Sequence, residues 1–386
     1  MERLIESVRK SFEKKFNRQP LLLASPGRIN LIGEHTDYNE GFVLPGATDR
    51  AVIFAVARRE DRRCRFYSLD FDQDYETDLD HLRKSEWRWP DYLQGVLDQF
   101  LKGGQAIQGL DLAFGGNVPI GGGMSSSAAV EGGLALAVNH LFSLNLDLLS
   151  LALLAQRAEN EFVGLRCGIM DMYANLHGQR GKVMKIDCRH LVHEYYPFDR
   201  PELRVIISDS GVRRELASSE YNVRRRQCEQ GVKILSRHYP EIKSLRDVSL
   251  DMLEEHRREF DPVVWKRCAY VVRENERVDL ACRDLLRHDF VSFGERMKES
   301  HRGLRDEYEV SSPELNLLVE SALRVPGVLG SRMMGAGFGG CTISLAEAGA
   351  VEEFRARVAE DYRRQTGREP AIHVVRIEAG TRILES

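Results

Sequence analysis

The sequence has 386 residues, with 55 Lys plus Arg against 59 Asp plus Glu and a formal charge of -4. At about 150 residues per domain, this length allows two or three domains with a sizeable core. The balanced charge argues against general nucleic-acid binding, which needs a basic surplus to neutralise phosphates. The longest nearly apolar run, residues 148–155, is less than half of the roughly 20 residues that span a bilayer, so we expect no membrane span.

The beginning of the chain and the cysteines bear on the cellular compartment. Residues 1–16 place Leu4, Val8 and Phe12 at helical spacing and lack the apolar core and cleavage site of a signal peptide. Seven cysteines are scattered without a CxxC pair or a His at metal spacing. This pattern fits reduced thiols better than disulfides or a zinc site, so we expect a cytoplasmic protein.

Helix and strand signals are mixed along the chain. Before residue 197, the patterns predict strands at 52–56, 110–114 and 183–186 and helices at 131–141 and 148–163. Beyond residue 201, a strand at 203–208 precedes long charged helices at 220–238, 263–288 and 290–302, and further strands follow. No Pro, Ser or Gly run resembles a flexible linker, so the boundary must be tight. We predict two lobes, residues 1–198 and 199–386.

The segment PIGGGMSSSAA, residues 119–129, follows an alternating strand and precedes an Ala-rich helix. Glycines let a backbone approach a ligand, and serines at a helix N-terminus offer hydroxyl and N–H groups where the dipole favours anions. The segment predicts a phosphate-binding loop, made of Gly121, Gly122, Gly123, Met124, Ser125, Ser126 and Ser127. A serine-capped helix after a glycine turn explains it equally well. Without the Lys of a Walker A loop, a P-loop NTPase is disfavoured.

A second glycine-bearing segment, MMGAGFGGC, spans residues 333–341 and matches GxGxxG through Gly335, Gly337 and Gly340. Residues 341–345 alternate like a strand, where a dinucleotide-binding turn needs a helix. We therefore interpret the segment as a glycine-rich hairpin turn. A role in which its backbone approaches a phosphate or a sugar stays open.

A third segment, SPGRINLIGEHTDYN at residues 25–39, crowds hydrogen-bonding side chains: Arg28, Asn30, Glu34, His35, Asp37, Tyr38 and Asn39. Carboxylates, amides and imidazoles can bind pairs of sugar hydroxyls, and Arg suits phosphate oxygens. The segment therefore predicts sugar recognition, with a solvated polar loop as the alternative.

In this order and spacing, the three segments resemble the GHMP kinase superfamily, and residues 25–39 are similar to the signature of its galactokinase family. Further blocks follow in the family's order: CGIMDMYANLHGQRG (167–181), IDCR (186–189), LASSEYNVRRRQC (216–228) and SHRGLRDEYEVSSPEL (300–315). The resemblance covers about residues 25–345.

The resemblance implies an α+β, two-lobed GHMP kinase fold. The N-terminal lobe would be like ribosomal protein S5 domain 2, the C-terminal lobe would be α/β, and the active site would lie between them. It also implies ATP-dependent phosphorylation of the anomeric hydroxyl of α-D-galactose to give α-D-galactose 1-phosphate and ADP. Galactose and ATP would be the partners of a monomer, with Mg²⁺ as cofactor.

The resemblance gives the catalytic roles to Asp171, facing the anomeric hydroxyl, and Arg28. Phosphoryl transfer mainly requires positioning and charge neutralisation, which a carboxylate and a cation can supply. Arg28 would keep Asp171 ionised, and Asp171 would accept or orient the anomeric proton. Without the resemblance, Asp171 is better interpreted as an acidic residue placed favourably in the first turn of a helix.

The remaining site residues also follow from the resemblance. Glu34, His35 and Asp37 would hold sugar hydroxyls, and Tyr221 would close the sugar pocket. The loop from Gly121 to Ser127 would wrap the ATP phosphates. Mg²⁺ would be held by two hard oxygen ligands, Ser127 and Glu159.

Other conspicuous side chains are expected to have structural roles. The run Arg224 to Arg226 should lie on a solvated helix face with salt bridges to Glu220 and Glu229. The histidines His177 and His301 should be structural, and Trp87 and Trp89 should be packing anchors.

Two positions depart from the galactokinase pattern: Met172, where the family usually has Gln, and the small residues Gly46, Ala47 and Thr48. Both are expected close to the sugar or nucleotide pocket, which leaves the hexose preference open. The alternatives are a GHMP kinase for another sugar, such as N-acetylgalactosamine, and a non-catalytic regulator that binds galactose and ATP. The polar groups of residues 34–37 disfavour small aliphatic alcohols, which would leave them unpaired.

Overall fold

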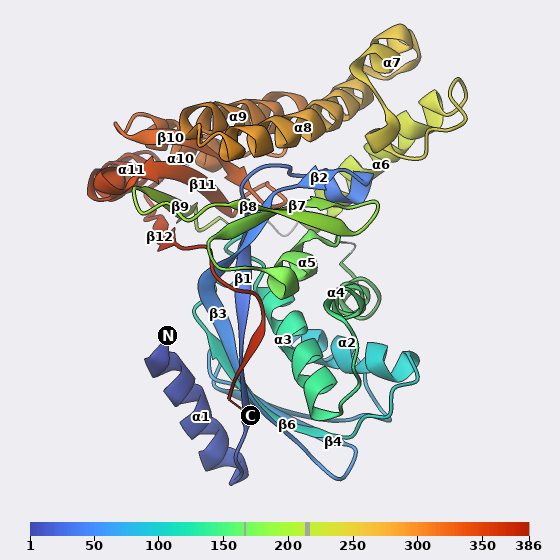
Figure 1. The fold of residues 1–386 in the computed structure, drawn as a ribbon, viewed down its shortest axis with the longest axis vertical. Helices are drawn as coiled ribbons and strands as arrows, with labels where there is room; N and C mark the ends of the chain where they lie inside the picture. The colour runs from blue at the N-terminus through green and yellow to red at the C-terminus, as the bar shows by residue number, and fades with distance from the viewer. Residues whose placement is uncertain (166, 213–216, 386) are drawn as a thin grey trace.

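The structure is a computed structural model that describes residues 1–165, 167–212 and 217–385 (Figure 1). Its first half is built on a six-stranded sheet in the order β13-β1-β3-β6-β4-β5. The strands are β1 (Leu21–Asn30), β3 (Pro45–Arg58), β4 (Arg63–Ser68), β5 (Gln73–Asp78), β6 (Leu110–Gly116) and β13 (Arg382–Glu385). The helices are α1 (Glu2–Phe16), α2 (Arg88–Lys102), α3 (Ser126–Leu141), α4 (Leu148–Arg157), the π-helix η2 (Ala158–Val163) and α5 (Met170–His177).

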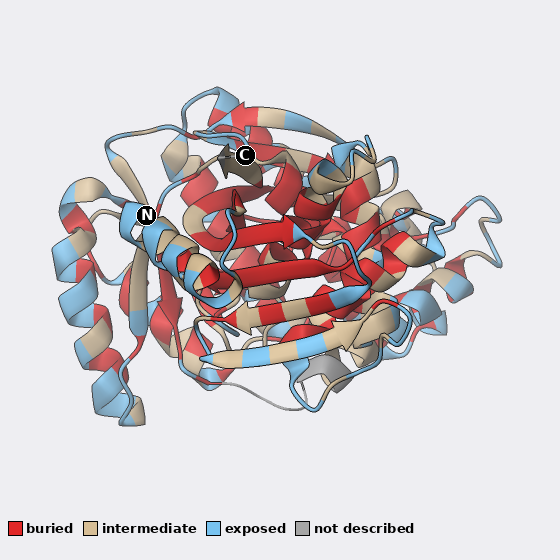
Figure 2. Ribbon diagram, turned by 90° about the horizontal axis from the view of Figure 1, so that it is seen from below, coloured by how far each residue is buried: buried red, intermediate tan, exposed pale blue. Residues whose placement is uncertain are grey.

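Both faces of the six-stranded sheet are covered, because its central strands are apolar on both sides. In β1, Leu22 packs with Val8 and Phe12 of α1 on one face. On the other face, Leu21 and Leu23 belong to the main core together with α2 to α5. Alternate residues of a strand point to opposite faces, so an uninterrupted apolar run serves two layers. Figure 2 shows α1 lying across the buried central strands.

The second half contains a four-stranded sheet in the order β10-β11-β9-β12. Its strands are β9 (Leu203–Asp209), β10 (Val328–Met334), β11 (Cys341–Glu347) and β12 (Ala371–Val375). The helices are α6 (Ala217–Leu235), α7 (Leu250–Glu255), α8 (Pro262–Leu286), α9 (Phe290–Arg302), the π-helix η5 (Gly303–Glu307), α10 (Pro313–Leu323) and α11 (Val351–Thr366). The 3-10 helices of the chain are η1 (Asp37–Asn39), η3 (Leu245–Asp247), η4 (Arg257–Glu259) and η6 (Ala348–Ala350).

A three-stranded sheet lies between these two halves (Figure 1). It consists of β2 (Phe42–Val43), β7 (Lys182–Asp187) and β8 (Val192–Pro197). The chain then enters the second half at β9 and returns at its end, where β13 pairs with β1. The division into residues 1–198 and 199–386 stays a prediction, and the return of β13 adds a strand from beyond residue 198 to the first sheet.

The predicted strands and long helices are confirmed, with shifted ends. The helix expected at 131–141 begins at Ser126, and the one expected at 148–163 changes to a π-helix at Ala158. The helix after residue 262 begins as its sequence suggests, since Asp261 caps it through Val263 N–H and Pro262 occupies its first turn. Among the described residues, no helix has both the length and the apolar character needed to cross a membrane.

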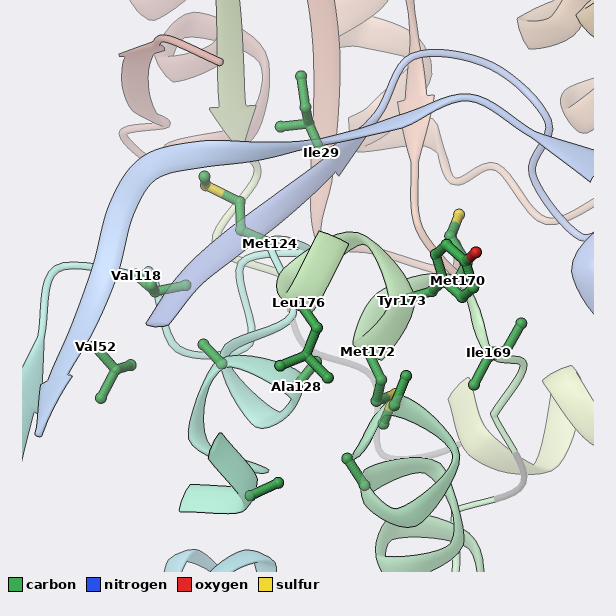
Figure 3. Packing of buried hydrophobic residues seen from close by; sticks show 14 of the residues in the cluster. Ile29, Val52, Val118, Met124, Ala128, Ile169, Met170, Met172, Tyr173 and Leu176 are labelled. Carbon is green, nitrogen blue, oxygen red and sulfur yellow. The ribbon is translucent and has the colours of Figure 1, made fainter. Parts of the chain in front are cut away.

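The core fixes the relative position of α3 and α5, which both begin at the candidate site. Met172 and Leu176 of α5 are buried in one cluster with Ala128 of α3 and Met124 of the preceding loop (Figure 3). Because this cluster is close-packed, the first residues of the two helices are held at a fixed distance. Met172 lies beside the site, as expected, since the preceding Asp171 lines one of its cavities, but the Met172 side chain is buried in the core and lines neither cavity.

Candidate active site

Arg28 of β1 and Asp171 of α5 form a two-pronged ion pair. Arg28 Nε donates to Asp171 Oδ1 at 2.7 Å, and Nη2 donates to Asp171 Oδ2 at 2.9 Å. The remaining guanidinium nitrogen, Nη1, donates to the carbonyl of Gly123 at 2.5 Å. Burial opposes the charge of Arg28, but the carboxylates of Asp171, Glu34 and Asp37 together outweigh it, and the pKa of Arg28 is raised. Arg28 therefore keeps its positive charge, and the pair is tied to the glycine loop.

Asp171 is the second residue of α5, so it does lie in the first turn of a helix, where a carboxylate is favourable. Its carboxylate, however, bonds to residues outside this helix. Besides Arg28, it accepts a hydrogen bond from the hydroxyl of Ser125. Ser125 precedes α3 and makes no side-chain cap to that helix. The serine-cap explanation of the glycine loop therefore fails at this residue, because its hydroxyl is used for Asp171.

The glycine loop before α3 has a backbone that few residue types can adopt. Gly121, Gly123 and Ser125 have φ of 66°, 74° and 52°, in the left-handed region. A Cβ at Gly122 would lie 2.7 Å from Cβ of Pro119. The loop lines a cavity of about 470 Å³, to which Ser126 and Ser127 at the start of α3 also contribute. A helix N-terminus beside a cavity suits an anionic ligand.

Glu34 is buried and held by two partners from the hairpin β10–β11. Its Oε1 accepts from Arg332 Nη2 at 3.0 Å and from the N–H of Gly335 at 2.9 Å. Arg332 is itself fully buried and also donates to the carbonyls of Leu31 and Asn30. The segment 335–340 is the predicted hairpin turn between antiparallel strands, and Gly335 also lines both cavities of the site.

His35 is fixed in one neutral tautomer. Its Nε2 lies 3.2 Å from the carbonyl of Ala336, which only accepts, so Nε2 carries the proton. Nδ1 then accepts from the hydroxyl of Tyr38 at 2.8 Å, and that hydroxyl accepts from Tyr308 at 2.7 Å. Burial lowers the pKa of His35 to about 3, which keeps the ring uncharged.

Asp37 and Tyr221 complete a second cavity of about 540 Å³. Arg28, Glu34, His35 and Asp171 also line it. Burial, then the charge of Asp171, raises the pKa of Asp37 to about 7. The ring centroid of Tyr221 lies 5.5 Å from that of His35. Acceptors and donors thus surround a space large enough for a small polar molecule, and the solvated-loop interpretation of residues 25–39 is wrong for these side chains.

Ser127 and Glu159 lie at the boundary of the two cavities. Glu159 lines both, and Ser127 lines the one beside the glycine loop. Burial, followed by the charge of Asp171, raises the pKa of Glu159 to about 7, and a hydrogen bond from Ser127 acts against this rise. A hydroxyl and a carboxylate in contact beside an anion site are hard oxygen donors, so these residues fit a Mg²⁺ ion.

Of the residues predicted for the site, all line the two cavities except Gly122 and Met124, and Met124 is buried in the core. The structure adds some residues that the sequence did not single out. Arg88 lines both cavities, Cys167 donates to Glu159 at 3.4 Å, and Arg332 holds Glu34. A charged residue inside the strand VLGSRMM was the available signal for Arg332. Ala47 and Thr48 line neither cavity, so the departures expected near the pocket are part of the surrounding packing.

The expectations for structural side chains are partly wrong. Arg225 does pair with Glu229, but Arg224 is buried and donates to the carbonyls of Tyr308 and Glu309. Trp87 is exposed, whereas Trp89 is buried as expected and also lines the cavity beside the glycine loop.

Three family models match the chain: the galactokinase galactose-binding signature over residues 10–58, the N-terminal domain of GHMP kinases over 91–179, and the C-terminal domain of GHMP kinases over 281–364. A galactokinase of Roseiflexus sp. (strain RS-1) is 42% identical over 374 residues, which cover 97% of this chain and 95% of that protein. A galactokinase of Chloroflexus aggregans is 45% identical over 367 residues, covering 94% of each.

The crystal structure of Lactococcus lactis galactokinase complexed with galactose matches with a TM-score of 0.94 at 33% identity, covering 98% of this chain and 99% of that one. The mevalonate kinase of Methanococcus jannaschii, at 16% identity and a TM-score of 0.64, shares the fold; the match covers 93% of this chain and 98% of that one. The fold and the glycine-loop site thus define a GHMP kinase, which confirms the predicted fold class. Within that superfamily, the chain belongs to the galactokinase family. It is a sugar kinase.

Proposed function

We propose that the protein transfers the γ-phosphoryl group of ATP to the anomeric hydroxyl of α-D-galactose, giving α-D-galactose 1-phosphate and ADP. The observation that carries this proposal is the position of the Arg28–Asp171 pair, which lines the cavity of the sugar signature and is bonded to the glycine loop. A hydroxyl in one cavity and a phosphate in the other would meet at this pair.

Galactose would occupy the cavity lined by Glu34, His35, Asp37 and Tyr221. Glu34 is anchored by Arg332 and Gly335 and is thereby held ready to accept hydroxyl hydrogen bonds with its remaining lone pairs. A site built from fixed acceptors rejects sugars that leave those acceptors unpaired, because buried polar groups without partners cost free energy. Tyr221 would cover the sugar and exclude water.

ATP would place its phosphates against the residues Gly121 to Ser127, where N–H groups and the N-terminus of α3 favour negative charge. Ser127 and Glu159 would hold Mg²⁺. When bound, the ion would neutralise charge on the phosphate oxygens.

The chain's own contribution to the transfer is to position and to neutralise. Asp171 would accept or orient the anomeric proton, since Arg28 keeps a positive charge against its carboxylate. Arg28 faces the glycine loop through Gly123 and would steady the negative charge that develops on the transferred group. The hydrogen bond from Ser125 fixes the rotamer of Asp171.

One assay tests the proposal: ADP release from ATP and Mg²⁺ with galactose, glucose, 2-deoxygalactose, N-acetylgalactosamine, mevalonate and homoserine as acceptors. We expect galactose to have the highest kcat/KM and glucose, which differs at C4, to be lower by up to about 10⁴ to 10⁵. Equal values for galactose and glucose would refute the assignment, and a preference for N-acetylgalactosamine would shift it to another sugar.

The seven cysteines are all free thiols, which supports a reducing, cytoplasmic setting for the enzyme. We propose that it acts as a monomer, as the sequence resemblance implies. Sedimentation at micromolar concentration would test this directly.

A further inference from the structure

A buried glutamate near the Ser127–Glu159 pair has no partner. Glu131 of α3 is fully buried, and neither of its carboxylate oxygens makes a hydrogen bond within the structure. Buried carboxylates are normally paired or hydrogen-bonded, because an isolated one is costly. Such a group is either a destabilising defect or a place prepared for a ligand.

The position of Glu131 on α3 favours the ligand site over the defect. Glu131 follows Ser127 by four residues, so the two side chains lie on the same face of the helix, one turn apart. Long side chains on an α-helix point back toward its N-terminus. By this tendency the carboxylate of Glu131 lies on the side of α3 that carries Ser127, one turn behind the residues that line the cavity of the glycine loop; Glu131 itself lines neither cavity.

The charges that act on Glu131 come from two other acidic residues of the site, Glu159 and Asp171. Its pKa is raised well above the usual value, first by burial and then by the charges of Glu159 and Asp171. The charge of Glu131 also contributes to raised pKa values of Tyr92 and Cys167. Glu131, Glu159 and Asp171 thus lie close enough to repel one another, and a divalent cation would relieve this repulsion.

We propose that Glu131 is a positioning residue of the magnesium site, whose carboxylate accepts hydrogen bonds from water molecules that the ion retains. Mg²⁺ dehydrates reluctantly and keeps several waters, so a carboxylate one turn beyond Ser127 suits this role. Acceptors around the direct ligands orient them and strengthen binding. The inference rests on the proposed function, since it assumes the ion at Ser127 and Glu159.

The test measures metal binding rather than turnover. Mn²⁺ replaces Mg²⁺, and its free fraction is followed by electron paramagnetic resonance in the presence of a non-hydrolysable ATP analogue. We expect Glu131→Gln and Glu131→Met to weaken Mn²⁺ binding by about 10-fold to 100-fold. The matched control is Glu161→Gln, which removes an exposed acidic residue of η2 whose carboxylate bonds to Gln99, and it should change Mn²⁺ binding less than about 2-fold.

The metal-free proteins give the second readout. Because Glu131 has no partner to lose, both variants should unfold at or above the temperature of the unaltered protein. Mn²⁺ affinity within about 2-fold of the unaltered protein in both variants would overturn the inference, and so would the failure of both to fold. If the unaltered protein phosphorylates galactose in either case, the proposed function stands and only the role of Glu131 is lost.

Discussion

At the scale of single residues, Asp171 connects the two cavities. It is a quarter exposed, bonded to Arg28 through both oxygens and to the hydroxyl of Ser125. These contacts come from β1 and from the glycine loop, so the position of the Asp171 carboxylate depends on both. In the proposed reaction, the property of Asp171 that matters is the negative charge of its carboxylate rather than its shape.

We expect Asp171→Asn to lower kcat by roughly 10² to 10⁴, the range for a positioned acid or base. The lower part of that range is expected, because a loose, metaphosphate-like transition state needs little help from a base. Galactose affinity, measured separately by calorimetry, and the affinity for an ATP analogue should change far less. A kcat within a few-fold of the unaltered enzyme would leave Asp171 a structural residue.

Asp37 gives the site a pH-dependent stability. Its pKa is raised to about 7 in the folded protein, against an ordinary value of 3.8, first by burial and then by Asp171. Between these pH values the folded state holds more protons than the unfolded state, so this group's contribution to stability falls as pH rises from about 4 to about 7. His35 acts in the opposite direction, because its pKa is lowered to about 3.

Asp37→Asn removes only the first of these two effects. We expect the unfolding temperature of the ligand-free variant to match that of the unaltered protein near pH 4 and to exceed it increasingly up to pH 8. Thermal unfolding at intervals of half a pH unit would show this. A difference that stays constant across the range would contradict the raised pKa of Asp37.

At the scale of elements, the hairpin β10–β11 is attached to the sugar segment through one buried ion pair. Arg332 of β10 donates to the carbonyls of Asn30 and Leu31 as well as to Glu34. Gly335, one residue beyond β10, adds its N–H to the same carboxylate. The hairpin therefore holds the segment that follows β1, although about 300 residues separate them in the sequence.

Arg332→Met leaves Glu34 buried without its charged partner. Breaking a buried pair on one side costs about 3–5 kcal/mol of unfolding free energy, because the remaining charge is uncompensated. Urea unfolding of this variant should show that loss. The control Arg324→Met breaks a half-exposed pair with Asp361 and should cost about 1 kcal/mol or less. Equal losses in the two variants would refute the role of Arg332.

At the scale of the whole molecule, local sequence patterns predicted the residues of the site better than they predicted how side chains pack. The glycine loop and residues 25–39 were recognisable because each is a short run whose chemistry depends on neighbours in the sequence. Arg224 was misassigned to a solvated face, because its burial depends on Tyr308 and Glu309 from a distant segment. Glu131 was not singled out for the same reason: only the folded structure shows that its carboxylate has no partner.

Thr381, which precedes β13, connects the last strand of the chain to β1 and α5. Its hydroxyl lies 2.9 Å from that of Ser25 in β1 and 2.7 Å from Oδ1 of Asn175 in α5. Thr381→Val keeps the shape and removes the hydroxyl that donates to the buried Oδ1 of Asn175, so we expect a loss of roughly 1–3 kcal/mol. Thr381→Ser retains the hydroxyl and should recover most of this loss in urea unfolding. A loss of equal size in both variants would attribute the effect to packing of the methyl group.

The pairing of β13 with β1 also has a consequence for how the protein is made. Residues 382–385 leave the ribosome about 350 residues after β1 does, which at 5–20 residues per second means a delay of roughly 20–70 s. Until then, the backbone groups on the outer edge of β1 have no strand to pair with, and an open edge invites pairing with other chains. The newly made enzyme thus passes through a period in which its first sheet has an open edge, and pairing of that edge with another chain during this period would compete with correct folding.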